Sequence, residues 1–385
     1  MTFDFDVLPD RLSTESVKWL AYEKDVLPMW VADMDFLSPQ PVIDALAQRV
    51  RHGVFGYPCE MPALRETIVE RMERLYGWKI TPEAVVLVPG VVTGFNLACH
   101  TIAQPGAGVL IQTPVYPPFF SAPADAGLVL QEMELTRGSD GAYSIDFDAF
   151  EAAITPETRM FILCNPHNPV GRVFTRFELE KMAEICMRHN LIICSDEIHC
   201  DLIFSGQTHI PVAKLNQEIA ERTITLIAPS KTYNIAGLEC SFAIIPDPDL
   251  RRQYQAARKG LTGHVNALGQ VAALAAYQDG QPWLDALLAY LEKNREVLLQ
   301  YVNSELPGIH MGRPEGTYLA WLDCRNGGLK ASPGKFFLQA ARVALNEGAA
   351  FGNGGSGFVR LNFGCPRSML LEALERMKAA LLASS

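Results

Sequence analysis

Seven short apolar runs in the middle of the chain constrain the fold more than any other feature of the sequence. Most of them are uninterrupted stretches of apolar residues, and amphipathic segments separate them, among which 177–189 is expected to form a crossover helix. Strands that are buried on both faces have this composition, because helices cover both sides of a mostly parallel sheet. The pattern therefore predicts an α/β fold around a mostly parallel seven-stranded sheet. The expected strands are 85–88, 109–112, 128–133, 160–165, 191–196, 223–228 and 241–245.

The last third of the chain has a different pattern, which predicts a smaller α+β domain. A long amphipathic helix is expected at 282–303, short strands at 317–322 and 358–363, and a closing helix at 367–382. The chain has 385 residues, whereas a single hydrophobic core rarely grows beyond about 250–300 residues. We therefore expect an N-terminal arm with part of the small domain at 1–45, a large domain at 46–275 and a C-terminal small domain at 276–385.

The charge balance and the cysteine pattern exclude several classes of protein. The net charge is −10 without a basic run, whereas binding to nucleic-acid backbones requires clustered cations. The acidic start has no signal-peptide pattern, and no apolar stretch approaches the ~20 residues that span a bilayer, so we expect a cytoplasmic protein. The nine cysteines are scattered singly, which favours reduced thiols, and Cys99-His100 and His199-Cys200 lack further ligands at a useful spacing, so no metal is expected.

Polar residues directly follow several expected strands, at the sheet edge where α/β proteins bind ligands. After the first strand, PGVVTGFN at 89–96 places glycines around a strand-to-helix turn. Its free N–H groups suit a phosphate, although a purely structural turn has the same pattern. Further along, CNPHNPVGR at 164–172 contains two Asn-Pro steps, and their extended path leaves Asn165 and Asn168 free to point outward. Both motifs indicate a site at this edge.

Two charged side chains at the same edge indicate catalysis. Asp196, in CSDEIH at 194–199, follows an apolar strand, where a buried carboxylate requires a cationic partner such as a protonated pyridine nitrogen. A helix N-cap is the alternative for this aspartate. Lys231, in APSKTYNIAGLE at 228–239, ends another buried strand among small and hydroxyl residues. A desolvated pocket lowers the pKa of a lysine and makes its amine nucleophilic, so Lys231 is the candidate Schiff-base residue.

The order of these motifs resembles that of a known superfamily. A phosphate turn, N-P-x-N-P-x-G, S-D-E, S-K and a late R-L-N-F-G are similar to the fold-type-I pyridoxal-phosphate enzymes, the aspartate-aminotransferase superfamily, over nearly the whole chain. Within it, the MalY/PatB group of cystathionine β-lyase-like C–S lyases is the most similar. The motifs that carry this resemblance are MWVADMDF (29–36), GVFGYP (53–58), SDEIHCDL (195–202), SKTYNIAGL (230–238) and VRLNFGCPR (359–367).

The resemblance implies pyridoxal 5'-phosphate as the cofactor and a role for individual residues. Lys231 would carry the cofactor as a Schiff base and later act as general base, while Asp196 would pair with the pyridinium nitrogen. Arg360 would grip the substrate carboxylate with its planar guanidinium. The other implied residues are Asn168 at the phenolic oxygen, Tyr116 stacked on the ring, Val91, Val92 and Ser230 at the phosphate, Ala32 and Tyr116 at the substrate, and Tyr57 at the phosphate of the neighbouring subunit in a homodimer.

Two positions depart from the aminotransferase pattern. Many members of the superfamily have a phosphate-binding arginine eight residues after the Schiff-base lysine, and Glu239 stands there in this chain. The tyrosine of the usual Asp-x-x-Tyr pattern is replaced by His199. His199 would donate a hydrogen bond towards the phenolic oxygen, or it is a structural histidine. A cation at Glu239's position is therefore not available to hold the phosphate.

The core motifs leave more than one reaction open. If the β-carbon of the substrate carries a thiolate leaving group, removal of the α-proton leads to pyruvate, ammonia and a thiol, which is C–S β-lyase chemistry. The same residues also serve an aminotransferase of a small amino acid. The resemblance favours the lyase. A cofactor-binding regulatory protein without catalysis is a further alternative, whereas the absence of G-x-G-x-x-G after the first strand argues against a nicotinamide dehydrogenase.

Overall fold

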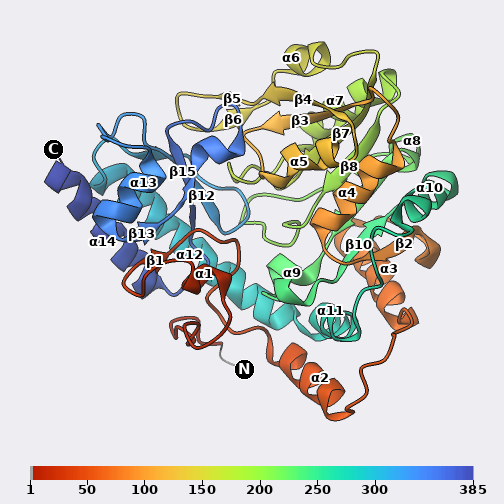
Figure 1. The fold of residues 1–385 in the computed structure, drawn as a ribbon, viewed down its shortest axis with the longest axis horizontal. Coiled ribbons are helices and arrows are strands. Elements are labelled where there is room, and N and C mark those ends of the chain that lie inside the picture. The colour runs from red at the N-terminus through yellow and green to blue at the C-terminus, as the bar shows by residue number, and fades with distance from the viewer. Residues whose placement is uncertain (1–2, 385) are drawn as a thin grey trace.

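A seven-stranded sheet forms the centre of the computed structural model, which describes residues 3–384. The strand order is β2-β10-β9-β8-β7-β3-β4, and the neighbours are parallel except that β10 runs antiparallel to β2 and β9 (Figure 1). The prediction of a mostly parallel seven-stranded sheet is confirmed. The strands are β2 Val85–Val88, β3 Gly108–Thr113, β4 Val129–Glu134, β7 Thr158–Cys164, β8 Ile192–Asp196, β9 Thr223–Ile227 and β10 Ser241–Ile244.

Helices cover both faces of this sheet, as the apolar runs require. Successive residues of β7 belong to different hydrophobic clusters. Met160 and Ile162 pack with α4 (Val91–Thr101) and α10 (Pro248–Arg258), whereas Phe161 and Leu163 pack with α7 (Arg176–Arg188). Side chains of a strand alternate between faces, so both faces are buried. β4 is different, because it lies at the edge of the sheet and most of its residues are half-buried or exposed. The expected helix at 177–189 is α7, Arg176–Arg188, which begins with a capping box from Thr175.

The last third of the chain forms a second, antiparallel sheet of four strands in the order β11-β12-β15-β14. Two long helices, α12 Gln281–Glu305 and α14 Arg367–Ser384, pack beside it, and both match the predicted helices. The strands β12 and β15 match the two predicted ones. The strands of this part and the remaining short ones are β1 Leu27–Pro28, β5 Thr136–Arg137, β6 Tyr143–Ser144, β11 His310–Met311, β12 Leu319–Asp323, β13 Val343–Ala344, β14 Asn346–Glu347 and β15 Phe358–Asn362.

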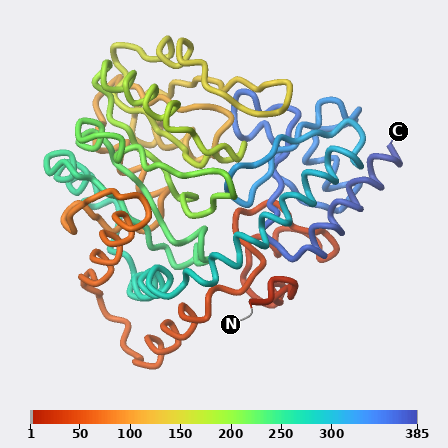
Figure 2. The backbone as a smooth tube through the Cα atoms, turned by 180° about the vertical axis from the view of Figure 1, so that it is seen from behind, coloured from red at the N-terminus to blue at the C-terminus, as the bar shows by residue number. Residues whose placement is uncertain are grey.

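The N-terminal arm lies against the C-terminal part of the molecule. β1 pairs in parallel with β13, and Arg376 of α14 donates to the carbonyl oxygen of Asp25 at 2.7 Å. Figure 2 accordingly shows the red N-terminal part of the chain beside the blue C-terminal part. The proposed domain boundaries stay a prediction. The other helices are α1 Val17–Leu20, α2 Gln40–Arg51, α3 Pro62–Tyr76, α4 Val91–Thr101, α5 Pro118–Asp125, α6 Phe147–Ala152, α8 Gln217–Glu221, α9 Pro229–Thr232, α10 Pro248–Arg258, α11 Ala267–Asp279 and α13 Pro333–Phe336.

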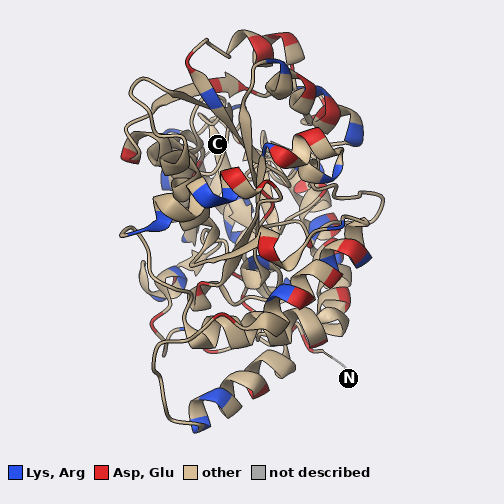
Figure 3. Cartoon of the chain, turned by 90° about the vertical axis from the view of Figure 1, so that its right-hand side faces the viewer, with Lys and Arg blue, Asp and Glu red and all other residues tan. Residues whose placement is uncertain are grey.

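The charged residues are mixed in sign on the side of the molecule that Figure 3 shows. Blue and red segments alternate along the helices there, so neither sign dominates that side. Among residues 3–384, no helix has the length and apolar character that crossing a membrane requires. All nine cysteines are free thiols, and eight of them are buried.

Candidate active site

A cavity of about 400 Å³ opens beyond the carboxyl ends of β7, β8 and β9, and residues of β15 and of the segment 30–32 close its other side. Parallel strands present their carboxyl ends at one edge of a sheet, which is why residues far apart in the sequence meet here. Ten residues that the sequence singles out line this cavity: Ala32, Val91, Val92, Tyr116, Asn168, Asp196, His199, Ser230, Lys231 and Arg360.

The start of α4 forms one end of the cavity. Gly90 has a positive φ of 90°, a left-handed conformation that favours glycine, and it directs the chain from β2 into the helix. No side chain caps this helix, so the N–H groups of Val91 and Val92 have no intrahelical partner. Ser230 lines the same cavity. This end therefore offers hydrogen-bond donors to an anion, and the positive end of the helix dipole favours negative charge there.

Glu239 also lines the cavity, and it is exposed and in a left-handed conformation with φ of 48°. The anion-binding end is thus built from backbone N–H groups and a hydroxyl, with an acidic residue in the same cavity lining. The glutamate that stands in place of the usual phosphate-binding arginine therefore also lines the folded site.

Lys231 extends into the cavity from α9, a single turn that follows β9. Its amine donates a hydrogen bond to the carbonyl oxygen of Ala32 at 2.6 Å. Removal of the amine from solvent lowers its pKa to about 8, and the positive charge of Arg360 acts in the same direction. A lysine amine with this pKa is partly neutral near neutral pH and able to act as nucleophile or base.

Asp196 ends β8 with its carboxylate buried, at 4% exposure. Its Oδ1 accepts a hydrogen bond from the N–H of Ile198 at 3.1 Å, but no helix begins there, so the alternative of a helix N-cap is wrong. Burial raises its pKa to about 7, and the neighbouring Glu197 adds to that effect. No ion pair with Asp196 exists among the described residues. The carboxylate is therefore set up to receive a cation.

Arg360, on β15, is a buried cation held by neutral groups. Its guanidinium donates to Asn168 Oδ1 at 3.0 Å, to the carbonyl oxygen of Trp30 at 2.9 Å and to Asn346 Oδ1 at 2.7 Å. Nε has no hydrogen-bond partner, and burial lowers the pKa to about 10. Because these three acceptors carry no charge, the guanidinium keeps its capacity to pair with a carboxylate of a ligand.

The two asparagines of the Asn-Pro motif have different positions. Asn168 lines the cavity and bonds Arg360, as described. Asn165 is buried outside the cavity lining, where its Oδ1 accepts a hydrogen bond from the N–H of Phe174 at 3.1 Å. The prediction that both side chains point outward is therefore wrong for Asn165, because this residue holds the turn between β7 and α7.

His199 and Tyr116 form parts of the cavity wall. The Nδ1 atom of His199 is buried without a hydrogen-bond partner, and its ring stands edge-on to that of Tyr318 with 6.0 Å between the centroids. Burial, with Lys231 and Arg360 nearby, lowers the pKa of His199 to about 3, so the ring is neutral. Tyr116 is half-buried, and burial together with Asp196 raises its pKa. Both side chains face the cavity in their neutral forms.

Tyr57 lies away from this cavity in the single chain. It is fully exposed, on the extended segment 53–61 that joins α2 to α3. The structure thus leaves the residue free, and its expected role in a neighbouring subunit stays a prediction. Trp30, Val31 and Asn346 are among the lining residues that the sequence analysis did not name individually. The first two lie in the MWVADMDF motif, which was a usable signal, whereas nothing in the sequence around Asn346 sets it apart.

Comparisons with known proteins give the same picture. Residues 24–377 match the model of the family described as aminotransferase class I and II. Cystathionine β-lyase PatB of Bacillus subtilis (strain 168) is 42% identical over 98% of this chain and 100% of its own length. The crystal structure of OvoB is 47% identical with a TM-score of 0.94, covering 98% of this chain and 99% of that one. Cystalysin from Treponema denticola, whose structure contains a pyridoxal 5'-phosphate cofactor, is 34% identical with a TM-score of 0.96 over both whole chains. This chain therefore belongs to the aminotransferase class I and II family.

Proposed function

We propose that this protein is a pyridoxal-phosphate-dependent carbon–sulfur β-lyase, which cleaves L-cystathionine or a related cysteine S-conjugate to pyruvate, ammonia and a thiol. The observation that carries the proposal is the cavity, where an amine of lowered pKa, a carboxylate without an ionic partner and a guanidinium held by neutral groups face one space. The relative named cystathionine β-lyase, similar over its whole length, supports C–S cleavage among the reactions of the family.

The side chains of the cavity fit pyridoxal phosphate. The uncapped start of α4 and the Ser230 hydroxyl would hold the phosphate, and Asp196 would pair with the pyridine nitrogen. Tyr116 and Asn168 line the space between these two ends. Bound there, pyridoxal phosphate supplies an electron sink for the electron pair that remains at the substrate α-carbon after proton removal.

The chain's own residues position the substrate and move its proton. Arg360 binds the α-carboxylate, since its guanidinium is buried and pairs with no carboxylate among the described residues. Lys231 removes the α-proton as general base, and its lowered pKa leaves part of the amine neutral near pH 7. Loss of the sulfur substituent from the β-carbon as a thiolate then breaks the C–S bond.

The charges of the cavity favour a thioether over an acidic amino acid. Among the described residues that line it, Lys231 and Arg360 are the only lysine or arginine side chains. The second carboxylate of aspartate or glutamate would find no further cation in this chain, and it would meet Glu239 or apolar wall residues such as Val31. A thioether sulfur at the β-carbon needs no such partner, and the second carboxylate of L-cystathionine lies at the end of a longer side chain beside its own ammonium group. This supports the lyase over an aminotransferase of acidic substrates.

We further propose that the active form is a homodimer in the cytoplasm. Tyr57 is fully exposed and stands beside two further exposed apolar side chains, Val54 and Phe55. Such a surface suits contact with a second copy, in which Tyr57 would approach the phosphate end of the neighbouring cavity. The nine free thiols support a reducing compartment.

The test is to incubate the purified protein with L-cystathionine in the absence of any keto acid and to measure pyruvate, ammonia and free thiol. We expect all three in equal amounts. Lys231→Ala should abolish the formation of these products and the yellow chromophore. The matched control is Lys181→Ala, which changes a partly exposed residue of α7 that does not line the cavity, and it should leave both unchanged.

Two other results would contradict the proposal. Turnover that appears only after a keto acid is supplied, with no release of thiol, would make the protein an aminotransferase. A protein that binds pyridoxal phosphate but does not convert L-cystathionine, with or without a keto acid, would be a cofactor-binding regulatory protein.

A further inference from the structure

The backbone segment 30–36 forms one wall of the cavity, and side chains hold it at almost every carbonyl. The carbonyl oxygen of Ala32 accepts hydrogen bonds from Lys231 Nζ at 2.6 Å and from the hydroxyl of Tyr318 at 2.9 Å. The neighbouring carbonyls are held by amides: Asn362 Nδ2 reaches the oxygens of residues 31 and 33, and Asn234 Nδ2 reaches those of 34 and 36. The position of the Ala32 oxygen is therefore tightly determined.

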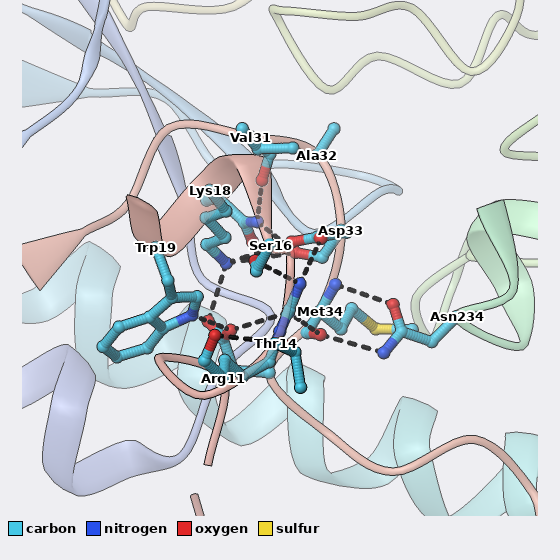
Figure 4. Close-up of polar contacts among 12 residues, drawn as sticks. Arg11, Thr14, Ser16, Lys18, Trp19, Val31, Ala32, Asp33, Met34 and Asn234 are labelled. Carbon is cyan, nitrogen blue, oxygen red and sulfur yellow. Dashed lines mark hydrogen bonds and ion pairs between the residues drawn. The ribbon is translucent and has the colours of Figure 1, made fainter. Parts of the chain in front are cut away.

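Residues 11–19, which do not line the cavity, contact this segment through a cluster of buried and partly buried charges (Figure 4). Lys18 Nζ lies 2.6 Å from Asp35 Oδ2, and the two side chains are 1% and 0% exposed. The same amine donates to the carbonyl oxygen of Asp33 at 3.2 Å and lies 3.5 Å from its Oδ1. Arg11 bonds both carboxylates, at 2.7 Å to Asp33 and 3.0 Å to Asp35, and Trp19 Nε1 donates to Asp35 at 2.8 Å. Two residues of the arm thus hold the two carboxylates on either side of Met34.

This cluster contacts the same backbone segment as the lysine that lines the cavity. Lys18 and Lys231 contact adjacent carbonyls of one segment, those of residues 33 and 32. Burying an ion pair contributes little net stability in comparison with an apolar pair of the same size, so stability alone does not account for a lysine and two aspartates at this place. A requirement for a fixed geometry of segment 30–36 does account for these three residues.

We propose that Lys18 is a positioning residue for Lys231, which acts by fixing segment 30–36 so that the Ala32 carbonyl receives the Lys231 amine whenever that amine is free. The Ala32 oxygen is then the resting place of the amine between its covalent bond to the cofactor and its work on the substrate proton. This inference rests on the proposed role of Lys231 as the cofactor-bearing residue.

The charges around Lys231 set the direction of the expected effect. Arg360 of β15 lowers the pKa of the amine, whereas Asp33 and Asp196 raise it, and the neutral His199 and Tyr318 complete the surroundings, with Glu239 at the phosphate end. Lys18 and Arg11 compensate part of the charge of Asp33. Removing the positive charge of Lys18 therefore makes the potential at Lys231 more negative, which moves the pKa of its amine upward.

The test follows the Lys231 amine without using turnover. Pyridoxal phosphate at saturating concentration is mixed with the full-length chain freed of cofactor, and the first-order appearance of the yellow chromophore is recorded from about pH 6 to about pH 10, on either side of the relevant pKa. We expect Lys18→Met to slow this step by about tenfold near neutral pH and to move its pH midpoint upward, because the amine is both displaced and more often protonated. Lys18→Arg keeps the charge and should restore the rate to within about threefold of the parent chain.

The control is Lys378→Met, which removes a half-buried lysine of α14 that pairs with Glu305 and does not line the cavity, and it should change neither the rate nor the midpoint. If Lys18→Met does not fold, Arg11→Gln replaces it, because Arg11 is partly exposed and its loss leaves the Lys18–Asp35 pair intact. It should produce the same changes to a smaller extent.

Two results would overturn the inference. One is a folded Lys18→Met or Arg11→Gln chain with the rate and the pH midpoint of the parent. The other is a folded Lys18→Arg chain as slow as Lys18→Met. A Lys231→Ala chain that still forms the same chromophore would show that the cofactor is not bound through Lys231, and the inference on Lys18 would fall with that assignment. Failure of the lyase function looks different, because the chain would then release no pyruvate or thiol from L-cystathionine while the rate of chromophore formation still depended on Lys18.

Discussion

Buried charges inside and outside the cavity differ in whether they are paired with one another. Outside the cavity lining, Lys18 pairs with Asp35, and Arg71 pairs with Asp201 at 2.6 Å with both side chains 3% exposed. Inside the cavity, Asp196 and Arg360 are also buried, yet neither is in an ion pair among the described residues. Buried charges are costly unless they are matched, so paired sets stabilise a fold while unpaired ones indicate where ligands bind.

The largest expected effect concerns the paired set. Arg71→Met leaves the carboxylate of Asp201 buried without its cation, and we expect the free energy of unfolding to fall by about 3–5 kcal/mol in denaturant titrations. The double change Arg71→Met with Asp201→Leu should recover most of this loss, because it removes both charges. A double variant as unstable as the single one would contradict the comparison.

The next effect concerns the arginine without a carboxylate partner. Arg360→Gln removes the cation proposed to bind the substrate carboxylate. We expect kcat/KM for L-cystathionine to fall roughly a hundredfold in steady-state assays, which corresponds to a rise of about 3 kcal/mol in the activation free energy. Its stability should change much less than that of Arg71→Met, since no carboxylate is left behind. A kcat/KM within about threefold of the parent would remove Arg360 from the substrate site.

The next effect concerns Asp196 and the dependence of stability on pH. Its folded-state pKa is raised from 3.8 to about 7. Between these two pH values the folded cofactor-free chain holds a proton that the unfolded chain has released. The free energy of unfolding therefore falls as pH rises from about 4 to about 7. Asp196→Asn should therefore stabilise the cofactor-free chain by about 2 to 4 kcal/mol above pH 7 and by nothing below about pH 4.

The same variant should lose activity, because the neutral amide does not pair with a protonated pyridine nitrogen. Thermal unfolding as a function of pH measures the first effect, and pyruvate release the second. Asp249→Asn, at an exposed residue of α10, is the matched control and should change neither. A pH-independent stability change in Asp196→Asn would show that this carboxyl is not protonated in the folded chain.

The smallest effect concerns Glu239, the acidic residue in the cavity lining. Glu239→Gln removes a negative charge from the expected phosphate end, and we expect pyridoxal phosphate to bind more tightly by about 0.5–1 kcal/mol, since the residue is exposed and solvent screens its charge. Equilibrium titration of the chromophore measures this difference. Weaker binding would mean that Glu239 supports the site instead of opposing the phosphate.

Much of the fold was readable from the sequence because its strands are buried on both faces. Continuous apolar runs located all seven strands to within two residues, and amphipathic periodicity located α7, α12 and α14. Side-chain direction in turns was less readable: Asn165 and Asn168 have the same Asn-Pro context, yet one holds a backbone N–H and the other faces the cavity. That choice depends on tertiary contacts with Phe174 and Arg360, which no local pattern encodes.

The site was readable where chemistry demands an unusual residue at the end of a strand, as for Asp196 and Lys231. Asn346 was not, because an asparagine in a short strand has many ordinary explanations. The Lys18 cluster was not readable either, because its partners come from separate segments of the arm and its charges are unremarkable until they are seen buried together. The positions of the domain boundaries and the role of Tyr57 stay predictions.

The pairing of β1 with β13 has a consequence for the order in which the protein becomes functional during synthesis. Leu27 aligns with Val343, and segment 30–36 is held by Asn362, so more than 300 residues separate partners that complete the same wall. A ribosome that has released Lys231 still has to produce β15 and Arg360. The central sheet can therefore form on the nascent chain well before the wall closes, and the working site is among the last parts of the molecule to be completed.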